Sequence, residues 1–310
     1  MSKHGIAGAK GIVLKQQRKF KFKLSTLFLY ITLFILVFIT LVPLIYTASA
    51  SFKTNSEIMS GGPHIIPKNF TLDNYYTAWT MGASDGASVG RKPATFADYT
   101  INSLIVALLA VTGTLIATSM SAYAFQRGRF PGKKIIYNIF LATMFISAGS
   151  VTIFPVVRLS VALGLSNLYG AAIVQMFSTG AANLFLTIGY LKTIHPEIDE
   201  AAKIDGCSFF RTFYNIILPL CKPILATVAL ISFRYSWNDY LLPMVFTIGK
   251  PAQYPLTVAI VQMKSFGGEG AAKYNLLMAG SMFSIVPITV LYLFFNRQFI
   301  AGLTQGSVKG

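Results

Sequence analysis

Residues 193–223 read TIHPEIDEAAKIDGCSFFRTFYNIILPLCKP, a stretch of mixed charge between two long apolar runs. Its first half predicts a short helix from Pro196 to Asp205. Proline suits the first helical position because its nitrogen has no hydrogen to donate. Gly206 fits the position just after the helix, since glycine adopts positive φ without steric cost. Three acids stand early in the helix, where the macrodipole favours negative charge: Glu197, Asp199 and Glu200.

The second half of the stretch predicts another helical segment, from Ser208 to Ile217. Phe209, Phe213 and Ile216 or Ile217 recur at helical spacing and would form an apolar stripe that lies against membrane helices. Pro219 and Pro223 follow, and proline interrupts a helix. We therefore expect the chain to bend there into the next apolar run.

Apolar runs dominate the chain on both sides of this stretch. The chain has 54% hydrophobic and 12% charged residues, whereas soluble domains average about 25% charged residues. A bilayer core needs roughly 20 apolar residues per helix. Six runs qualify, of which the fifth also carries Arg234 and Asp239: 24–50, 101–125, 135–157, 168–191, 223–246 and 274–295. The sequence thus predicts an all-α membrane protein with six transmembrane helices.

Basic residues indicate which segments face the cytoplasm, because short cytoplasmic loops collect Lys and Arg. Residues 1–23 and the loop QRGRFPGKK at 126–134 are basic and contain no acid, whereas residues 51–100 balance the two signs. Both termini are therefore expected in the cytoplasm. The net charge of +16 then reflects membrane topology rather than nucleic-acid binding.

The predicted organisation follows from these runs and charges. The first apolar run is too long for a signal peptide and lacks a small-residue cleavage site, so it is interpreted as an uncleaved span. The parts are a basic cytoplasmic N-tail (1–23), a first transmembrane helix (24–50), an extracytoplasmic loop (51–100), a transmembrane core (101–298) that includes a cytoplasmic loop at 192–222, and a cytoplasmic C-tail (299–310).

The polar loop also fits a spaced pattern: E-A-A, three residues, G, nine residues, I, one residue, L-P. With this pattern the chain resembles the permease subunits of binding-protein-dependent ABC importers. The resemblance implies that the short helix is a coupling helix, which docks in a cleft of a cytoplasmic ATPase. Glu200 would accept hydrogen bonds from basic groups of that partner, and the small pair Ala201 and Ala202 would permit close approach. The residues expected to couple to the ATPase are Glu200, Ala201, Ala202, Asp205, Gly206, Ile216, Leu218 and Pro219.

The same resemblance implies a non-catalytic subunit of the cell membrane, embedded in lipid. Its expected partners are a second homologous permease subunit, two cytoplasmic ATPase subunits and an extracytoplasmic solute-binding protein. ATP and Mg would be bound by the ATPase, and this chain would hold no cofactor of its own.

Further segments resemble the maltose and multiple-sugar branch of these permeases, which implies an oligosaccharide substrate. They are SFKTNSEI from Ser51, IPKNFTLDNYYTAW from Ile66, WNDYLLP from Trp237, YPLTVAI from Tyr254 and FIAGLTQGSVKG from Phe299. The chain departs from that branch at Tyr46, where tryptophan is expected, and at Asn296-Arg297, where a glutamine-containing pair is usual. These departures concern the substrate subtype rather than the coupling motif.

Two more groups of residues are candidates for function. By resemblance the C-tail would reach the interface of the ATPase subunits through Gly302, Leu303, Thr304, Gly306, Lys309 and Gly310; the alternative is a frayed terminus. Polar groups in a span tend to face a cavity or a partner, so the substrate-pathway candidates are Tyr235, Trp237, Asn238 and Asp239. The alternative for this group is structural: an Arg234–Asp239 ion pair, or contacts with the second permease.

Other classes of function were weighed against the importer. A secondary transporter driven by an ion gradient would show inverted repeats and several buried carboxylates, and Asp239 is the one acid within a predicted span. A membrane receptor or scaffold would not need the spaced loop. His4, His64 and His195 are scattered and the two cysteines lack ligand spacing, so no metal site is predicted. GRFPGKK lacks the spacing of a P-loop and its Ser or Thr.

Overall fold

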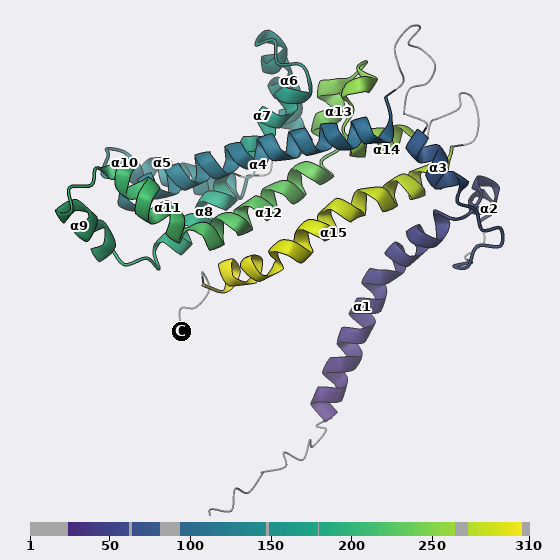
Figure 1. Cartoon of the computed structure of the whole chain (residues 1–310), viewed down its shortest axis with the longest axis horizontal. Coiled ribbons are helices and arrows are strands. Elements are labelled where there is room, and N and C mark those ends of the chain that lie inside the picture. Colours follow the sequence, from purple (N-terminus) through teal and green to yellow (C-terminus); the bar gives the residue numbers. More distant parts are fainter. Residues whose placement is uncertain are drawn as a thin grey trace, which may run out of the picture. The chain divides into compact units, whose positions relative to one another are not determined.

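The computed structural model describes residues 24–61, 64–80, 94–146, 149–178, 180–263 and 272–305. Every regular element in these ranges is helical (Figure 1). The chain divides into two compact units, Met1–Tyr46 and Thr47–Gly310. The prediction of an all-α protein is thus confirmed for the described residues.

Helix α1 (Leu24–Ala50) makes up the described part of the first unit, and its last residues belong to the second. It has 27 residues and no charged side chain. At 1.5 Å per residue it is about 40 Å long, which exceeds the roughly 30 Å of a bilayer core. α1 covers the same residues as the first predicted apolar run.

Three long helices form the centre of the second unit: α4 (Phe96–Arg127), α12 (Lys222–Asn238) and α15 (Tyr274–Gln305). α12 packs against both α4 and α15, as Figure 1 shows. α4 also packs against α7 (Leu168–Ser178) and α8 (Gly180–Leu191). α4 is therefore the helix around which the second unit is arranged.

Buried aromatic side chains join the three central helices. Trp237 of α12 is 2% exposed, stacks on Phe233 and donates a hydrogen bond from Nε1 to the carbonyl oxygen of Ser284 on α15 at 3.1 Å. Phe96 of α4 meets Phe283 of α15 with ring centroids 4.8 Å apart. Aromatic contacts of this kind add to the stabilisation from area burial alone.

The second and sixth predicted runs are confirmed as single helices, α4 and α15. Together with α1 they are the three described helices that are long and apolar enough to cross a membrane. Two bent pairs raise the number to as many as five: α7 with α8, at 45°, and the segment Phe209–Leu220 with α12, at 77°.

The third and fifth runs are interrupted, which the hydropathy pattern did not predict. Residues 135–157 fall into α5 (Lys133–Thr143), the 3-10 turn η1 (Gly149–Thr152) and α6 (Ile153–Ala162). Gly149 and Ser150, at this interruption, are poorer helix formers than the residues around them. The fifth run breaks after Asn238, because Asp239 has an extended backbone, and it resumes as α13 (Leu241–Thr247). The turn η3 (Pro251–Gln253) and helix α14 (Leu256–Met263) follow, with α14 packed on α4 and α15.

The predicted extracytoplasmic loop contains α2 (Asn55–Met59) and α3 (Asp73–Thr80). Asn74, 4% exposed, connects its two halves. The Asn74 amide donates to the carbonyl oxygens of Ser51 at 2.8 Å and Lys53 at 2.7 Å, and its oxygen accepts from Asn275 of α15 at 2.7 Å. This side chain therefore ties the SFK segment to the helical core.

The Glu57 carboxylate performs a similar local role nearer the surface. It accepts hydrogen bonds from the backbone N–H groups of Lys68 at 2.8 Å and Asn69 at 3.3 Å. The bond from Lys68 is the main reason that the pKa of this carboxyl lies below its ordinary value. The ionised side chain thus closes the turn between α2 and α3.

We predict that Asn74→Ala lowers the free energy of unfolding by about 2 kcal/mol, because it leaves buried carbonyl groups without donors. Thermal unfolding of the purified chain in detergent would measure this. Asn69→Ala is the matched control, since the exposed Asn69 uses only its backbone N–H, and its effect should stay within about 0.5 kcal/mol. Equal melting temperatures for the two variants would contradict the assigned role of Asn74.

Candidate functional site

Helix α9 (Glu197–Ile204) confirms the helix predicted in the polar loop to within one residue at each end. Its end is a Schellman motif, in which Cys207 N–H donates to the Ala202 carbonyl at 2.9 Å and Gly206 N–H donates to that of Lys203 at 3.0 Å. Gly206 has φ +75°, which glycine adopts at little cost. The motif reverses the chain sharply, so that α9 forms the tip of the loop in Figure 1.

The two faces of α9 differ in exposure. Asp199 and Ala202 are buried on its inner face. Glu200 and Ala201 are exposed, and Ile204 is 87% exposed, which is unusual for a large apolar side chain. The expected contact pair therefore divides: Ala201 faces outward, and Ala202 packs within the chain. The outward face combines acid with apolar surface, a composition suited to a protein partner.

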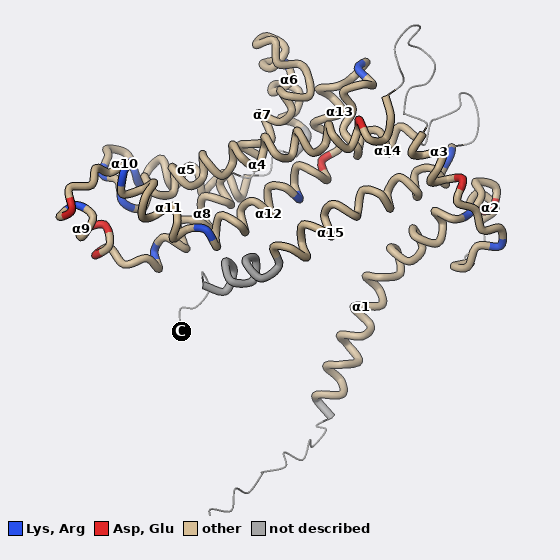
Figure 2. Tube along the Cα trace, viewed as in Figure 1, with Lys and Arg blue, Asp and Glu red and all other residues tan. Residues whose placement is uncertain are grey.

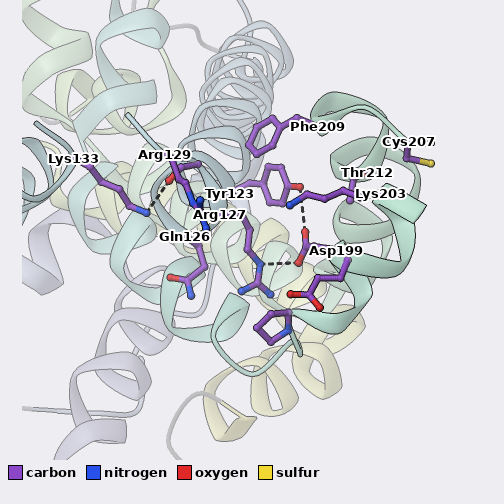
Figure 3. Close-up of a pocket in the computed structure, with 13 residues that line it drawn as sticks. Tyr123, Gln126, Arg127, Arg129, Lys133, Asp199, Lys203, Cys207, Phe209 and Thr212 are labelled. Carbon is purple, nitrogen blue, oxygen red and sulfur yellow. Dashed lines mark hydrogen bonds and ion pairs between the residues drawn. The ribbon is translucent and has the colours of Figure 1, made fainter. Parts of the chain in front are cut away.

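An ion pair holds α9 against the end of α4 (Figure 3). Arg127 Nε lies 2.8 Å from Asp199 Oδ2, and both side chains are nearly nine-tenths buried. Arg127 also donates from Nη2 to the carbonyl oxygen of Ile194 at 2.7 Å, and the Tyr123 hydroxyl donates to Asp199 Oδ1 at 3.2 Å. The last two turns of α4 thus bind both the start of the loop, at Ile194, and helix α9.

The second half of the loop packs onto the same tyrosine. Tyr123 meets Phe209 with ring centroids 4.5 Å apart and Phe213 at 5.2 Å. These rings lie on α10 (Phe209–Thr212), which the Ser208 hydroxyl caps, and at the start of η2 (Phe213–Ile217). The predicted apolar stripe is therefore directed at α4.

The element η2 is a π-helical turn, in which the Leu218 N–H donates to the Phe213 carbonyl. Such turns are rare and occur frequently at functional sites. The spaced motif ends here: Ile216 and Leu218 are half-buried and Pro219 is exposed in α11 (Leu218–Leu220). After α11 the chain bends at Cys221 into α12, as the two prolines predicted.

A cavity of about 350 Å³ opens between the end of α4 and the loop (Figure 3). Four basic residues and two acidic ones line it: Arg127, Arg129, Lys133, Lys203, Asp199 and Glu200. Charge gathers at this end of the second unit in Figure 2, whereas α15 carries none from Tyr274 to Phe295. A second group of charged residues lies around α2 and α3 in Figure 2, so the loop is one of two polar regions of an apolar helical body.

The substrate-pathway candidates fall into two groups. Trp237 is buried in the core, whereas Tyr235 and Asn238 are exposed. Asp239 accepts a hydrogen bond from the buried Gln175 of α7 at 2.9 Å, and Arg234 is exposed rather than paired with this carboxylate. The structure thus brings Asp239 together with Gln175, which the sequence analysis did not single out.

The tail residues Gly302, Leu303 and Thr304 lie at the end of α15. Gly306, Lys309 and Gly310 lie outside the described residues. Contact of the tail with an ATPase therefore stays a prediction.

The two cysteines differ in accessibility. Cys207, next to Gly206, is partly exposed, and Cys221 is 3% exposed. Among the described residues, no three His, Cys, Asp or Glu side chains come together in a way that could hold a metal ion.

Known proteins resemble this chain over most of its length. Residues 86–304 match the family described as "Binding-protein-dependent transport system inner membrane component". The chain is 32% identical to the galactooligosaccharides transport system permease protein GanQ of Bacillus subtilis over 92% of this chain and 95% of the relative. It is also 32% identical to the arabinooligosaccharides transport system permease protein AraQ of Halalkalibacterium halodurans, over 89% and 93%.

A solved structure shares the fold. It belongs to a bacterial ABC transporter involved in the import of the acidic polysaccharide alginate. The TM-score is 0.71 at 24% identity, covering 88% of this chain and 95% of that one.

We predict that Arg127→Gln and Asp199→Asn each lower the free energy of unfolding by about 3 kcal/mol, because each leaves the other charge buried and unpaired. In the double variant the losses should fall short of their sum by about 1–3 kcal/mol. Thermal unfolding in detergent and limited proteolysis of the loop would measure both effects. Arg129→Gln, which changes an exposed arginine of the same cavity, is the control. Strictly additive losses of unfolding free energy in the double variant would contradict an interaction between Arg127 and Asp199.

Proposed function

This chain belongs to the family of binding-protein-dependent transport system inner membrane components, and on that premise we propose that it is a permease subunit of an ABC importer for an oligosaccharide. The relatives that transport galactooligosaccharides and arabinooligosaccharides support the substrate class, because they match nearly the full length of the chain. ATP hydrolysis is assigned to a separate subunit. This chain would be coupled to that subunit through conformational change and would take no part in the hydrolysis itself.

One observation carries the coupling role: α9 presents an exposed face while its opposite face is fixed to α4. Glu200, Ala201 and Ile204 are exposed, and Asp199 on the other side is held by Arg127. A segment that transmits force must be both accessible to its partner and rigidly attached to what it moves. α9 meets both requirements.

The proposed membrane arrangement follows from the loops. Six crossings would place both termini and the loop of α9 in the cytoplasm, with α2 and α3 outside. The bent pairs and the broken third run then count as crossings that are not straight, which is tolerated where the bundle satisfies the freed backbone groups. A solute-binding protein would deliver the sugar on the outer side, and two ATPase subunits would dock on the inner side.

In the proposed mechanism, ATP-driven closure of the ATPase dimer moves α9 as a rigid body. Because Arg127 and Tyr123 connect α9 to α4, the movement is passed to the central helix and changes the pathway between inward-facing and outward-facing states, a two-state equilibrium biased by nucleotide. The pathway itself would lie between this chain and a second permease, with Tyr235 and Asn238 as its exposed candidates for sugar contacts. The C-tail would add a further contact with the ATPase.

Cys207 offers a native reporter for this docking, since it lies just beyond Gly206 in the motif that ends α9. In the permease pair without ATPase, a maleimide should modify Cys207 and not the buried Cys221. Binding of the ATPase subunit should slow modification of Cys207 at least about tenfold, as expected when an interface excludes the reagent. Mass spectrometry of the cysteine peptides would measure both rates in one sample.

Glu200→Lys and Gly206→Trp should abolish the protection and reduce co-purification of the ATPase, because the first reverses a charge of the docking face and the second strains a residue with positive φ. Lys222→Gln, an exposed change away from α9, is the control. If an ATPase co-purifies while Cys207 reacts at its original rate, the docking site lies elsewhere. If no ATPase or second permease co-purifies and uptake follows an ion gradient, the importer proposal is wrong.

A further inference from the structure

A second pocket, separate from the coupling face, lies between the end of α4, the start of α5 and the end of α8. Its volume is about 240 Å³, and three lysines line it: Lys133, Lys134 and Lys192. Its lining contains no acid. Lys134 and Lys192 are exposed, whereas Lys133 donates to the carbonyl oxygen of Gly128 at 3.0 Å. Three like charges around one pocket repel each other, and an anion bound between them would offset this repulsion.

The first turn of α5 adds to this excess of positive potential. Its N-cap is Gly132, which supplies no side-chain hydrogen bond, and its first two residues are lysines rather than acids. The N-terminus of a helix carries partial positive charge, so lysine is disfavoured there and anions are favoured. A bound anion would reverse the unfavourable interaction and accept hydrogen bonds from the free N–H groups of that turn.

Apart from Gln126, the remaining wall of the pocket is aromatic or aliphatic. It contains Tyr137 and the buried Ile188 together with Phe125, whose ring contacts both Tyr137 and Phe140. Next to it, α5 exposes Ile135 and Ile139. A basic rim beside exposed apolar surface matches an amphiphile better than a free ion, because a free phosphate would make no use of the apolar wall.

We propose that this pocket binds the phosphate group of an anionic phospholipid, with Lys134, Lys192 and the first turn of α5 around the phosphate and an acyl chain along the apolar face of α5. Basic pockets between membrane helices on the cytoplasmic side are suited to such head groups. The proposal rests on the membrane placement of the proposed function but not on ATPase docking. Asp199 and Glu200 line the neighbouring cavity, which shares Lys133 with this pocket.

A photoactivatable phosphatidylglycerol would test the proposal on the full-length chain in phosphatidylcholine nanodiscs, a sample that requires no partner subunit. Cross-linked peptides covering residues 125–140 and 184–194 give a readout specific to this pocket. Lys134→Gln/Lys192→Gln should raise the lipid concentration for half-maximal cross-linking by roughly 30-fold, since each lysine near an anionic head group contributes about fivefold. Lys134→Arg/Lys192→Arg should retain cross-linking.

Arg211→Gln/Lys222→Gln is the matched control. It also removes two exposed positive charges, but these lie in the 192–222 loop and do not line the pocket. Competition by unlabelled phosphatidylglycerol, but not by phosphatidylcholine or inorganic phosphate, is the expected result. Equal competition by inorganic phosphate would identify a free-anion site and overturn the lipid proposal. Equal competition by phosphatidylcholine, or an equal loss in the control variant, would also overturn it. None of these outcomes depends on whether the ATPase docks at α9.

Discussion

The buried ion pair between Arg127 and Asp199 is the interaction on which the proposed coupling depends. α9 has eight residues, and a helix that short is unstable in water without tertiary contacts. Its outer face is exposed, so its conformation depends on what its inner face contacts. The Schellman motif at Gly206 fixes where the helix ends, and Arg127 fixes where it lies. A buried ion pair is weak support for net stability. We infer that this one serves instead to fix the orientation of α9, which is what a coupling element requires.

α4 extends this restriction through the second unit. At its far end Asn102 donates to the carbonyl oxygens of Ala252 and Tyr254, and Ser103 accepts from the backbone N–H of Leu256 at the start of α14. On α14, Thr257 donates in turn to the carbonyl oxygen of Asp239 at 2.8 Å. The helix that holds α9 is therefore also bonded to the segment next to the broken fifth run. Movement of α4 as a body would act on both places at once.

Local patterns in the sequence predicted the ends of α9, the stripe of Phe209 and Phe213, and the bend before α12, because capping residues, helical spacing and proline act over a few residues. Hydropathy predicted α1, α4 and α15, but it averages over a window and could not detect the interruptions after Thr143 and at Asp239. Arg127 was interpreted only as a topology signal. Nothing in a linear sequence shows that its side chain pairs with Asp199, which lies 72 positions later in the chain. Gln175 was missed for the same reason: a single polar residue in an apolar run reveals its partner only when the helices are packed.

ATP hydrolysis by the complete importer in lipid, with and without sugar-loaded binding protein, tests the coupling most directly when wild type is compared with Asp199→Asn. The account predicts that the variant assembles with its ATPase and retains basal hydrolysis but loses most of the stimulation by binding protein, because α9 is no longer fixed to α4. Stimulation equal to that of wild type would contradict it, and would show that force reaches the membrane helices by contacts other than the Arg127–Asp199 pair.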